Sequence, residues 1–388
     1  YGGEALATVP TFTYLGVPFY AGVQRRGSAQ VIMQCRLAKA RSVMYALRKR
    51  CRELGIHNVS ILCSLFDSLC VSVLNYGCEL WGAYLLSDLE RKGWGDVGAC
   101  ELWHRLFLRS ILQVRQSTTA AVMMNECTRV PLAHSWCQRL VGWWNRVVSR
   151  DDEGDLVQMA LRESITSLSH RIPNGRSNAC WGLSFRNMVC SIDASLARSI
   201  DALECIDCDA LLDRLKSRWH THVWGDWLNL PANSPPLRTI PDTESKGFKL
   251  ATYRHFICPT LLEPGQGFTA HVHQPREIKA LATFRMSSHD LNIERLRHAR
   301  VPRSERLCMC CDLGAREDEL HILECPAYAA IRARFSDLIP PYPVAGPDEE
   351  LLCAVLNPQE DGMWSRLAGF LLIVMSERTM RLDLIQNN

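Results

Sequence analysis

The sequence has no long apolar run and no recognisable leader. The longest apolar stretch near its end, Leu367 to Met375, is far too short to cross a bilayer. No positively charged start is followed by an apolar segment, so no secretory signal is expected. We therefore expect an intracellular protein, in the nucleus or the cytoplasm, with no membrane partner.

The chain also has little net charge, +3 over 388 residues, so its overall charge does not imply a polyanionic partner. One segment, however, lacks charge of one sign, because no Asp or Glu occurs from Arg25 to Arg52. A locally basic segment in a nearly neutral chain indicates one electropositive face. Its basic residues include Arg25, Arg26, Arg36, Lys39, Arg41, Arg48, Lys49 and Arg50.

The pattern of apolar residues predicts a mainly α fold. Residues 11 to 19, TFTYLGVPF, are rich in aromatic and β-branched side chains and predict a strand or a short N-terminal hairpin. From Ser28 to about Gly55, apolar residues recur at three- and four-residue steps, which is typical of an amphipathic helix. Further helices are predicted near 58–74, 96–114, 132–149, 155–167, 191–215 and 364–385.

Proline-rich and polar stretches suggest where the domains end. PANSPPLRTIPDTESKG, residues 231–247, has the composition of a linker. It separates a first segment, 1–82, and a helical connector, 83–230, from a smaller α lobe. That lobe comprises a zinc-binding region, 248–340, and a C-terminal helix, 341–388.

Cysteine is abundant, with 18 copies scattered along the chain. Without a secretory signal, most of them are expected to be reduced thiols that pack as small core residues. The segment from 308 to 325 differs, because Cys308, Cys311, His321 and Cys325 follow the spacing C-x2-C-x9-H-x3-C. Three thiolates and one imidazole make a closed tetrahedral shell that suits a structural Zn²⁺ ion.

Local spacing explains how these four side chains can meet. Two residues between Cys308 and Cys311 allow a tight turn, and residues 312–314, DLG, allow the chain to reverse. One of the acids at 317–319 can accept the second ring N–H of His321. Cys310 is interpreted as a bystander, because using it would shrink the turn to one residue.

Two other groups resemble metal sites less well. Cys205 and Cys208 are also two residues apart, and His220 and His222 follow them. We expect these cysteines to lie within a continuous helix, where no turn aims them at one ion. His271 and His273 form a second, weaker pair.

Several stretches resemble the C-terminal portion of non-LTR (LINE-type) retrotransposon reverse transcriptases. FTYLGVPF resembles the strand pair after the palm, and LFDSLCVSVLNYGCELWG, residues 65–82, resembles the thumb. The stretch at 281–308 and EDELHILECPAY resemble the family's zinc-binding region. Residues that match that region upstream of the first zinc cysteine are Arg285, Ser288, His289, Pro302, Arg303 and Arg306.

The resemblance implies a thumb-like lobe that binds an RNA and DNA template-primer. The implied contacts are the basic helix, at Arg25, Arg26, Arg36, Lys39, Arg41 and Lys49, and Arg303 and Arg306 beside the zinc knuckle. The family's polymerase palm precedes the segment that residues 11–19 resemble. The chain is therefore expected to be the tail of a longer protein, with the upstream polymerase domain as a partner.

The catalytic part of this family is missing from the sequence. Its active site needs three carboxylates, including an aromatic-x-Asp-Asp turn, to hold two Mg²⁺ ions. The only Asp-Asp pair, Asp151-Asp152, lies in SRDDEGD and reads as a polar turn. Mg²⁺ is thus expected only in an upstream catalytic domain, and the chain alone is expected to have no polymerase activity.

Two alternatives to a non-catalytic nucleic-acid-binding segment stay open. The zinc knuckle can belong to a protein-interaction module that binds no nucleic acid. The chain can also be an enzyme in its own right, although no set of nucleophile, base and metal is visible.

Overall fold

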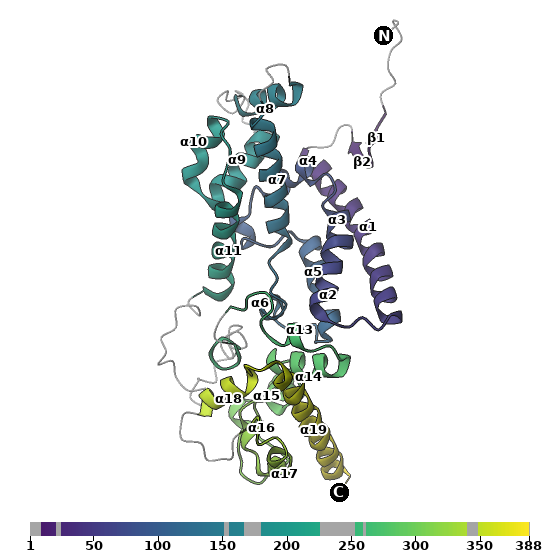
Figure 1. Ribbon diagram of the computed structural model, residues 1–388, viewed down its shortest axis with the longest axis vertical. Helices are drawn as coiled ribbons and strands as arrows, with labels where there is room; N and C mark the ends of the chain where they lie inside the picture. The colour runs from purple at the N-terminus through teal and green to yellow at the C-terminus, as the bar shows by residue number, and fades with distance from the viewer. Residues whose placement is uncertain are drawn as a thin grey trace, which may run out of the picture. The chain divides into compact units, whose positions relative to one another are not determined.

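The computed structural model describes most of the chain as helix. The two strands β1 (Thr11–Tyr14) and β2 (Val17–Tyr20) form an antiparallel hairpin near its start (Figure 1). The predicted mainly α class is confirmed. The described residues are 9–20, 25–150, 155–166, 180–225, 253–258, 261–339 and 348–387.

The chain divides into two compact units, and each unit combines three separate stretches of sequence. This division differs from the continuous ranges predicted above, and residues 231–247, the predicted linker, lie outside the described residues. Unit 1 comprises residues 1–50, 65–104 and 130–223, and unit 2 comprises residues 51–64, 105–129 and 224–388.

The hairpin and the long helix of unit 1 follow the sequence pattern. Leu15 and Gly16 connect β1 to β2, and both have positive φ, 47° and 76°, as a two-residue hairpin turn requires. Helix α1 (Arg25–Glu53) then buries one apolar stripe, which includes Met33 and Leu37. The hairpin and the amphipathic helix are therefore where the sequence predicts them.

Aromatic side chains form much of the remaining core of unit 1. The Trp81 and Trp136 rings meet edge to face with centroids 4.9 Å apart, and Trp144 stacks on Phe185 at 4.9 Å. The other elements that lie wholly or mainly in unit 1 are η1 (Phe66–Val71), α3 (Ser72–Leu74), α4 (Cys78–Leu86), η2 (Glu90–Lys92), α7 (Leu132–Val148), α8 (Leu156–Thr166), α9 (Trp181–Ile192), η3 (Ala194–Leu196), α10 (Ala197–Asp201) and α11 (Cys208–Trp224).

One predicted helix is interrupted. The helix expected over 191–215 is broken between α10 and α11, where Leu203 has a φ of 57°. The Asn145 side chain holds this break, because it donates to the Ile206 carbonyl at 2.8 Å and accepts from the Ile206 N–H at 2.9 Å. Residue spacing within the segment could not reveal a partner 61 residues away.

Unit 2 is built around a fully buried ion pair. Arg285 contacts Glu126 at 2.8 Å, both side chains have no exposed surface, and the Tyr253 hydroxyl donates to the same carboxylate at 2.8 Å. This network joins segments far apart in the sequence. Elements wholly or mainly in unit 2 are α2 (Val59–Leu65), α6 (Ala120–Glu126), η6 (Tyr253–Ile257), α13 (Phe268–His271), α14 (Pro275–Arg285), α15 (Asn292–His298), η7 (Arg303–Glu305), α16 (His321–Glu324), η8 (Pro326–Tyr328), α17 (Ala329–Ala333), α18 (Asp348–Leu356) and α19 (Asp361–Gln386).

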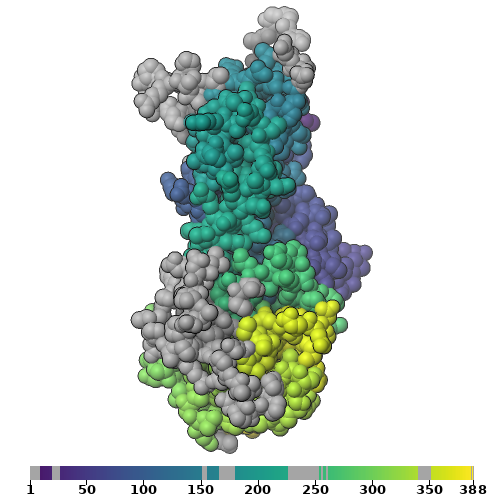
Figure 2. Space-filling model, turned by 60° about the vertical axis from the view of Figure 1, so that its left-hand side comes forward, coloured from purple at the N-terminus to yellow at the C-terminus, as the bar shows by residue number. Residues whose placement is uncertain are grey.

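Helix α5 (Ala99–Leu112) contributes residues to both units. Within unit 2, α19 packs along α14 and α17, and the yellow C-terminal residues lie against the green ones (Figure 2).

Among the described residues, no single helix has both the length and the apolar composition to span a membrane. The bent pair at 59–74 and 78–86, which turns by 91°, meets that test only when taken together.

Candidate metal centre and basic helix

The first two candidate ligands lie in a tight reversal of the chain. Leu307 and Arg316 face each other in an antiparallel bridge, and the Cys308 N–H donates to the Ala315 carbonyl at 2.8 Å. Gly314 has a φ of +61°, a conformation that glycine adopts without a Cβ penalty. The reversal predicted at residues 312–314 is therefore present, and it brings Cys308 and Cys311 back towards the segment that follows.

The other two candidate ligands lie at the start and just after the end of the short helix α16 (His321–Glu324). His321 begins this helix, and its N–H is bound by the Asp318 carboxylate at 3.0 Å. Cys325 ends it, and Arg332 donates to the Cys325 carbonyl at 2.6 Å. These contacts hold the backbone at both ends of α16.

The four side chains converge as the spacing predicts. One ligand atom from each of Cys308, Cys311, His321 and Cys325 lies within 4.8 Å of the others. The Cys311 Sγ and His321 Nε2 atoms are 3.4 Å apart, close to the separation of about 3.5 Å expected for sulfur and nitrogen ligands of one tetrahedral zinc ion. The four residues therefore form a group that can hold a metal ion, and its donors are compatible with zinc.

A second possible group uses Cys308 with Cys310 and Glu317, and its ligand atoms also lie within 4.8 Å. The Glu317 carboxylate is already engaged, because both its oxygens accept from the buried Arg378, at 2.6 and 2.7 Å. The Asn292 N–H donates to it as well, at 2.7 Å. A carboxylate held in this way is a poor metal ligand, which favours the group that contains Cys311 and His321.

The neighbouring acids each have a partner of their own. Asp318 is bound by Arg316 at 2.9 Å, and Glu319 accepts from Ser287 at 2.9 Å and contacts His289 Nε2 at 3.0 Å. Burial opposes ionisation of Glu319, but the charge and hydrogen bond of His289 lower the pKa of this carboxyl to about 2. Asp318 therefore holds residues 308–325, the metal loop, from within, and Glu319 ties that loop to Ser287 and His289.

The segment at 205–208 does not form such a group. Cys205 lies in the exposed loop before α11, and Cys208 is the first residue of that helix, so they are not in one continuous helix as predicted. The Cys205 Sγ lies 3.4 Å from the Ser149 hydroxyl. Within the described ranges, neither cysteine belongs to a cluster of potential metal ligands. The predicted continuous helix over both cysteines is therefore wrong, because α11 begins only at Cys208.

The two histidines of the weaker pair each contact a different polar side chain. His271 contacts Asp361 at 3.1 Å, and the ring of His273 is bonded to the Asn58 amide at 2.8 Å. Asp151 and Asp152 lie outside the described residues.

The basic residues of α1 fall into two groups. Lys39, Arg41 and Lys49 are exposed, whereas Arg36 is buried. Arg36 donates to the Gly16 carbonyl at 2.6 Å, and its guanidinium lies 4.2 Å from the Tyr76 ring centroid. Arg36 therefore fixes the hairpin to the helix, and the predicted role in nucleic-acid contact is corrected. The side chains of Arg25 and Arg26 lie outside the described residues.

The arginines beside the metal loop are buried as well. Arg303 is 6% exposed and Arg306 is 2% exposed, and burial lowers the pKa of Arg303 to about 10. Arg306 donates to the carbonyls of Val301 and Ile293, at 2.7 and 3.0 Å. Both were predicted to face nucleic acid. Their burial, and these carbonyl contacts of Arg306, instead indicate that they support the loop.

Two further residues were not among those predicted from the sequence. Arg378 was invisible because its partner Glu317 is 61 residues away. Tyr45 had a readable signal, because it stands four residues from both Arg41 and Lys49. It is 65% exposed.

Comparison of the chain with family models, curated proteins and solved structures finds no match.

Proposed function

We propose that the chain binds RNA or DNA through the outer face of α1, as a non-catalytic C-terminal segment of a retroelement reverse transcriptase. The main support is the line formed by Arg41, Tyr45 and Lys49. All three side chains are exposed, and the chain has no acid from Arg25 to Arg52.

The helical spacing of Arg41, Tyr45 and Lys49 determines what these side chains can bind. Residues four apart lie on one face of a helix, so two cations flank one exposed aromatic ring. The cations can neutralise phosphates, and the ring can stack on an unpaired base. With no acid in the helix before Glu53, no neighbour in the same helix competes with phosphate for these cations.

The metal group has a separate, structural role in unit 2. Three thiolates and one imidazole would hold Zn²⁺ in a closed shell, with no position left for a reacting water. We assign this zinc a structural role, since such binding free energy becomes folding free energy. Any polymerase activity would require Mg²⁺ and an upstream catalytic domain that supplies the missing carboxylates.

The test reverses charge on α1 without touching Arg36. The double variant Arg41→Glu/Lys49→Glu should bind a short RNA–DNA duplex at least about tenfold more weakly. Loss of two phosphate contacts should reduce the slope of log affinity against log salt by about 1.8. Fluorescence anisotropy over a salt series measures both quantities.

The matched control is Arg198→Glu/Lys216→Glu, which makes the same charge change at two exposed positions of unit 1. It should keep most of the affinity. If both double variants lose affinity equally, general charge explains the binding, and α1 is not the contact face.

A protein-binding role is the second candidate, and the N-terminal hairpin favours it. Phe12 and Tyr14 are 58% and 60% exposed, and Leu15 is 71% exposed. Exposed apolar side chains that lie together can mark an interaction surface. A parent protein that binds neither duplex nor single strand at low salt would favour this role over nucleic-acid binding.

A further inference from the structure

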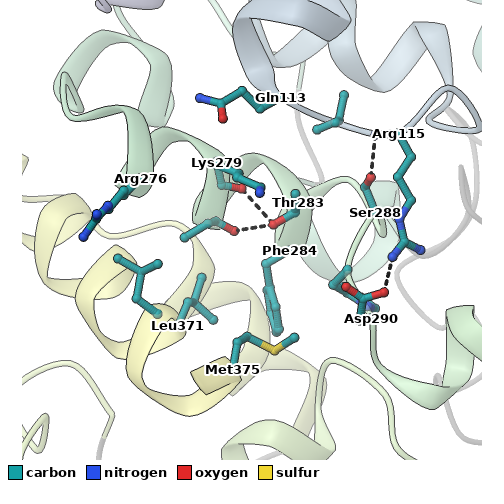
Figure 3. A pocket seen from close by; sticks show the side chains of 14 residues that line it. Gln113, Arg115, Arg276, Lys279, Thr283, Phe284, Ser288, Asp290, Leu371 and Met375 are labelled. Atoms are coloured by element: carbon teal, nitrogen blue, oxygen red, sulfur yellow. Dashed lines mark hydrogen bonds and ion pairs between the residues drawn. The ribbon is translucent and has the colours of Figure 1, made fainter. Parts of the chain in front are cut away.

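Unit 2 contains an open cavity of about 540 Å³, within the range of about 300–1,000 Å³ that small ligands occupy. Figure 3 shows Lys279, Thr283 and Phe284 on α14 above Leu371 and Met375 on α19. One wall is therefore polar and basic, and the floor is apolar. A ligand that fits must combine an anionic group with a flat apolar body.

The charges at the rim favour an anion. Arg276 and Lys279 are three residues apart on α14, both are exposed, and neither side chain forms a hydrogen bond or ion pair with the described residues. Arg115 adds a third cation, already paired with Asp290 (Figure 3). Two uncommitted cations on one helix face can thus meet a phosphate.

His289 adds a buried imidazole to the lining of the cavity. Its side chain is 2% exposed, and its Nδ1 atom is buried without a hydrogen-bond partner. Hydroxyl groups of Thr283 and Ser288 lie in the same lining and extend the polar wall.

The wall of the cavity is also attached to the metal loop. Glu319, two residues before the ligand His321, contacts the His289 ring at 3.0 Å. The bidentate pair between Arg378 and Glu317 connects the loop to α19, the helix that forms the floor. The cavity therefore depends on the fold of the loop around its metal.

We propose that this cavity holds one unpaired nucleotide of an RNA or DNA strand, with its phosphate at Arg276 and Lys279 and its base over Met375. The choice of a nucleotide rests on the nucleic-acid binding proposed above. The base would lie between Phe284 and the α19 side chains, where stacking is tolerant of sequence. The nucleic-acid-binding face of α1 and this nucleotide site would then be two separate sites.

The test measures binding of a fluorescent 12-nucleotide oligouridine RNA to the full chain. Arg276→Glu/Lys279→Glu should weaken binding about tenfold, and Met375→Trp, which fills the cavity, should weaken it by a similar factor. The control Arg300→Glu/Arg334→Glu carries the same charge change at exposed positions of unit 2 outside the lining, and it should bind like the parent. Because the reversed residues are exposed, thermal unfolding should be unchanged in both double variants.

Photo-crosslinking separates the possible outcomes. A 4-thiouridine oligonucleotide should crosslink to peptides at 276–290 or 371–375, and the Arg276→Glu/Lys279→Glu variant should lose these crosslinks. Crosslinks confined to α1, with equal oligouridine affinity for parent and cavity variants, would overturn the cavity site and leave the α1 proposal intact. Failure of the parent to bind any nucleic acid would overturn both proposals. Binding of uridine monophosphate to the chain, without any oligonucleotide crosslink, would assign the cavity to a free nucleotide. That result would overturn the proposal that the cavity holds part of a strand.

Discussion

The two Cys-x2-Cys segments of this chain have the same local spacing and different structures. Cys308 and Cys311 meet His321 and Cys325 within 4.8 Å. Cys205 and Cys208 lie at the entrance to α11, one exposed and one half-buried. Two cysteines at this spacing therefore do not form a metal site by themselves.

A metal site also needs a reversal of the chain that brings further ligands close to the two cysteines. At 308–325 a positive-φ glycine and an antiparallel bridge bring α16 back to the cysteines. At 205–208 the chain continues into a helix, and Asn145 bonds the backbone at Ile206. The fold of residues 308–325 depends on the ligand group, and the fold at 205–208 depends on Asn145 in α7. Loss of a metal ligand should therefore disturb only the first segment, and loss of Asn145 only the second.

Removing a ligand should have the largest effect. Cys311→Ser and His321→Asn should each release about one zinc per chain and destabilise unit 2 by about 4 kcal/mol or more, because ligand binding contributes to folding. Cys208→Ser is the control and should leave the zinc content unchanged. Atomic absorption and thermal unfolding measure the two effects. An unchanged zinc content in both ligand variants would mean that Cys311 and His321 do not bind the zinc, and that the two segments do not differ in this way.

Breaking the anchor of the metal loop should have the next largest effect. Arg378→Met leaves the buried Glu317 carboxylate without its ion-pair partner and should cost about 3 kcal/mol. The double variant Arg378→Met/Glu317→Leu should recover part of that loss, because it removes the unpaired charge. Chemical denaturation measures these differences.

Arg381→Met on the same helix is the control for this anchor. Its partner Glu377 is one helical turn away, and its side chain is 40% exposed, so the cost should stay below about 1 kcal/mol. Equal costs for Arg378→Met and Arg381→Met would mean that the loop is not anchored by Arg378.

The other segment should be sensitive to Asn145. Asn145→Ala removes two hydrogen bonds to Ile206 and should destabilise unit 1 by about 2 kcal/mol, with zinc content unchanged. Ser149→Ala, at the residue that follows the end of α7, should cost less than about 0.5 kcal/mol. A loss of zinc in Asn145→Ala would contradict the independence of the two segments.

Local patterns were sufficient for many elements of the fold. The periodicity from Ser28 to Gly55 predicted α1 because the helix needs only one apolar stripe. The hairpin, the reversal at 312–314 and the set of four ligands were likewise readable, since each depends on residues close in sequence. Burial was less predictable, and Arg36, Arg303 and Arg306 look in the sequence like surface cations.

Residue spacing and backbone preference are enough to predict the helical class, the hairpin turn and the identity of the four possible metal ligands. Which arginines are buried, where the helix before Cys208 stops, and which segments share unit 2 become known only from the folded chain. These features depend on partners such as Glu317 with Arg378 and Glu126 with Arg285, which are far apart along the chain and meet only after folding.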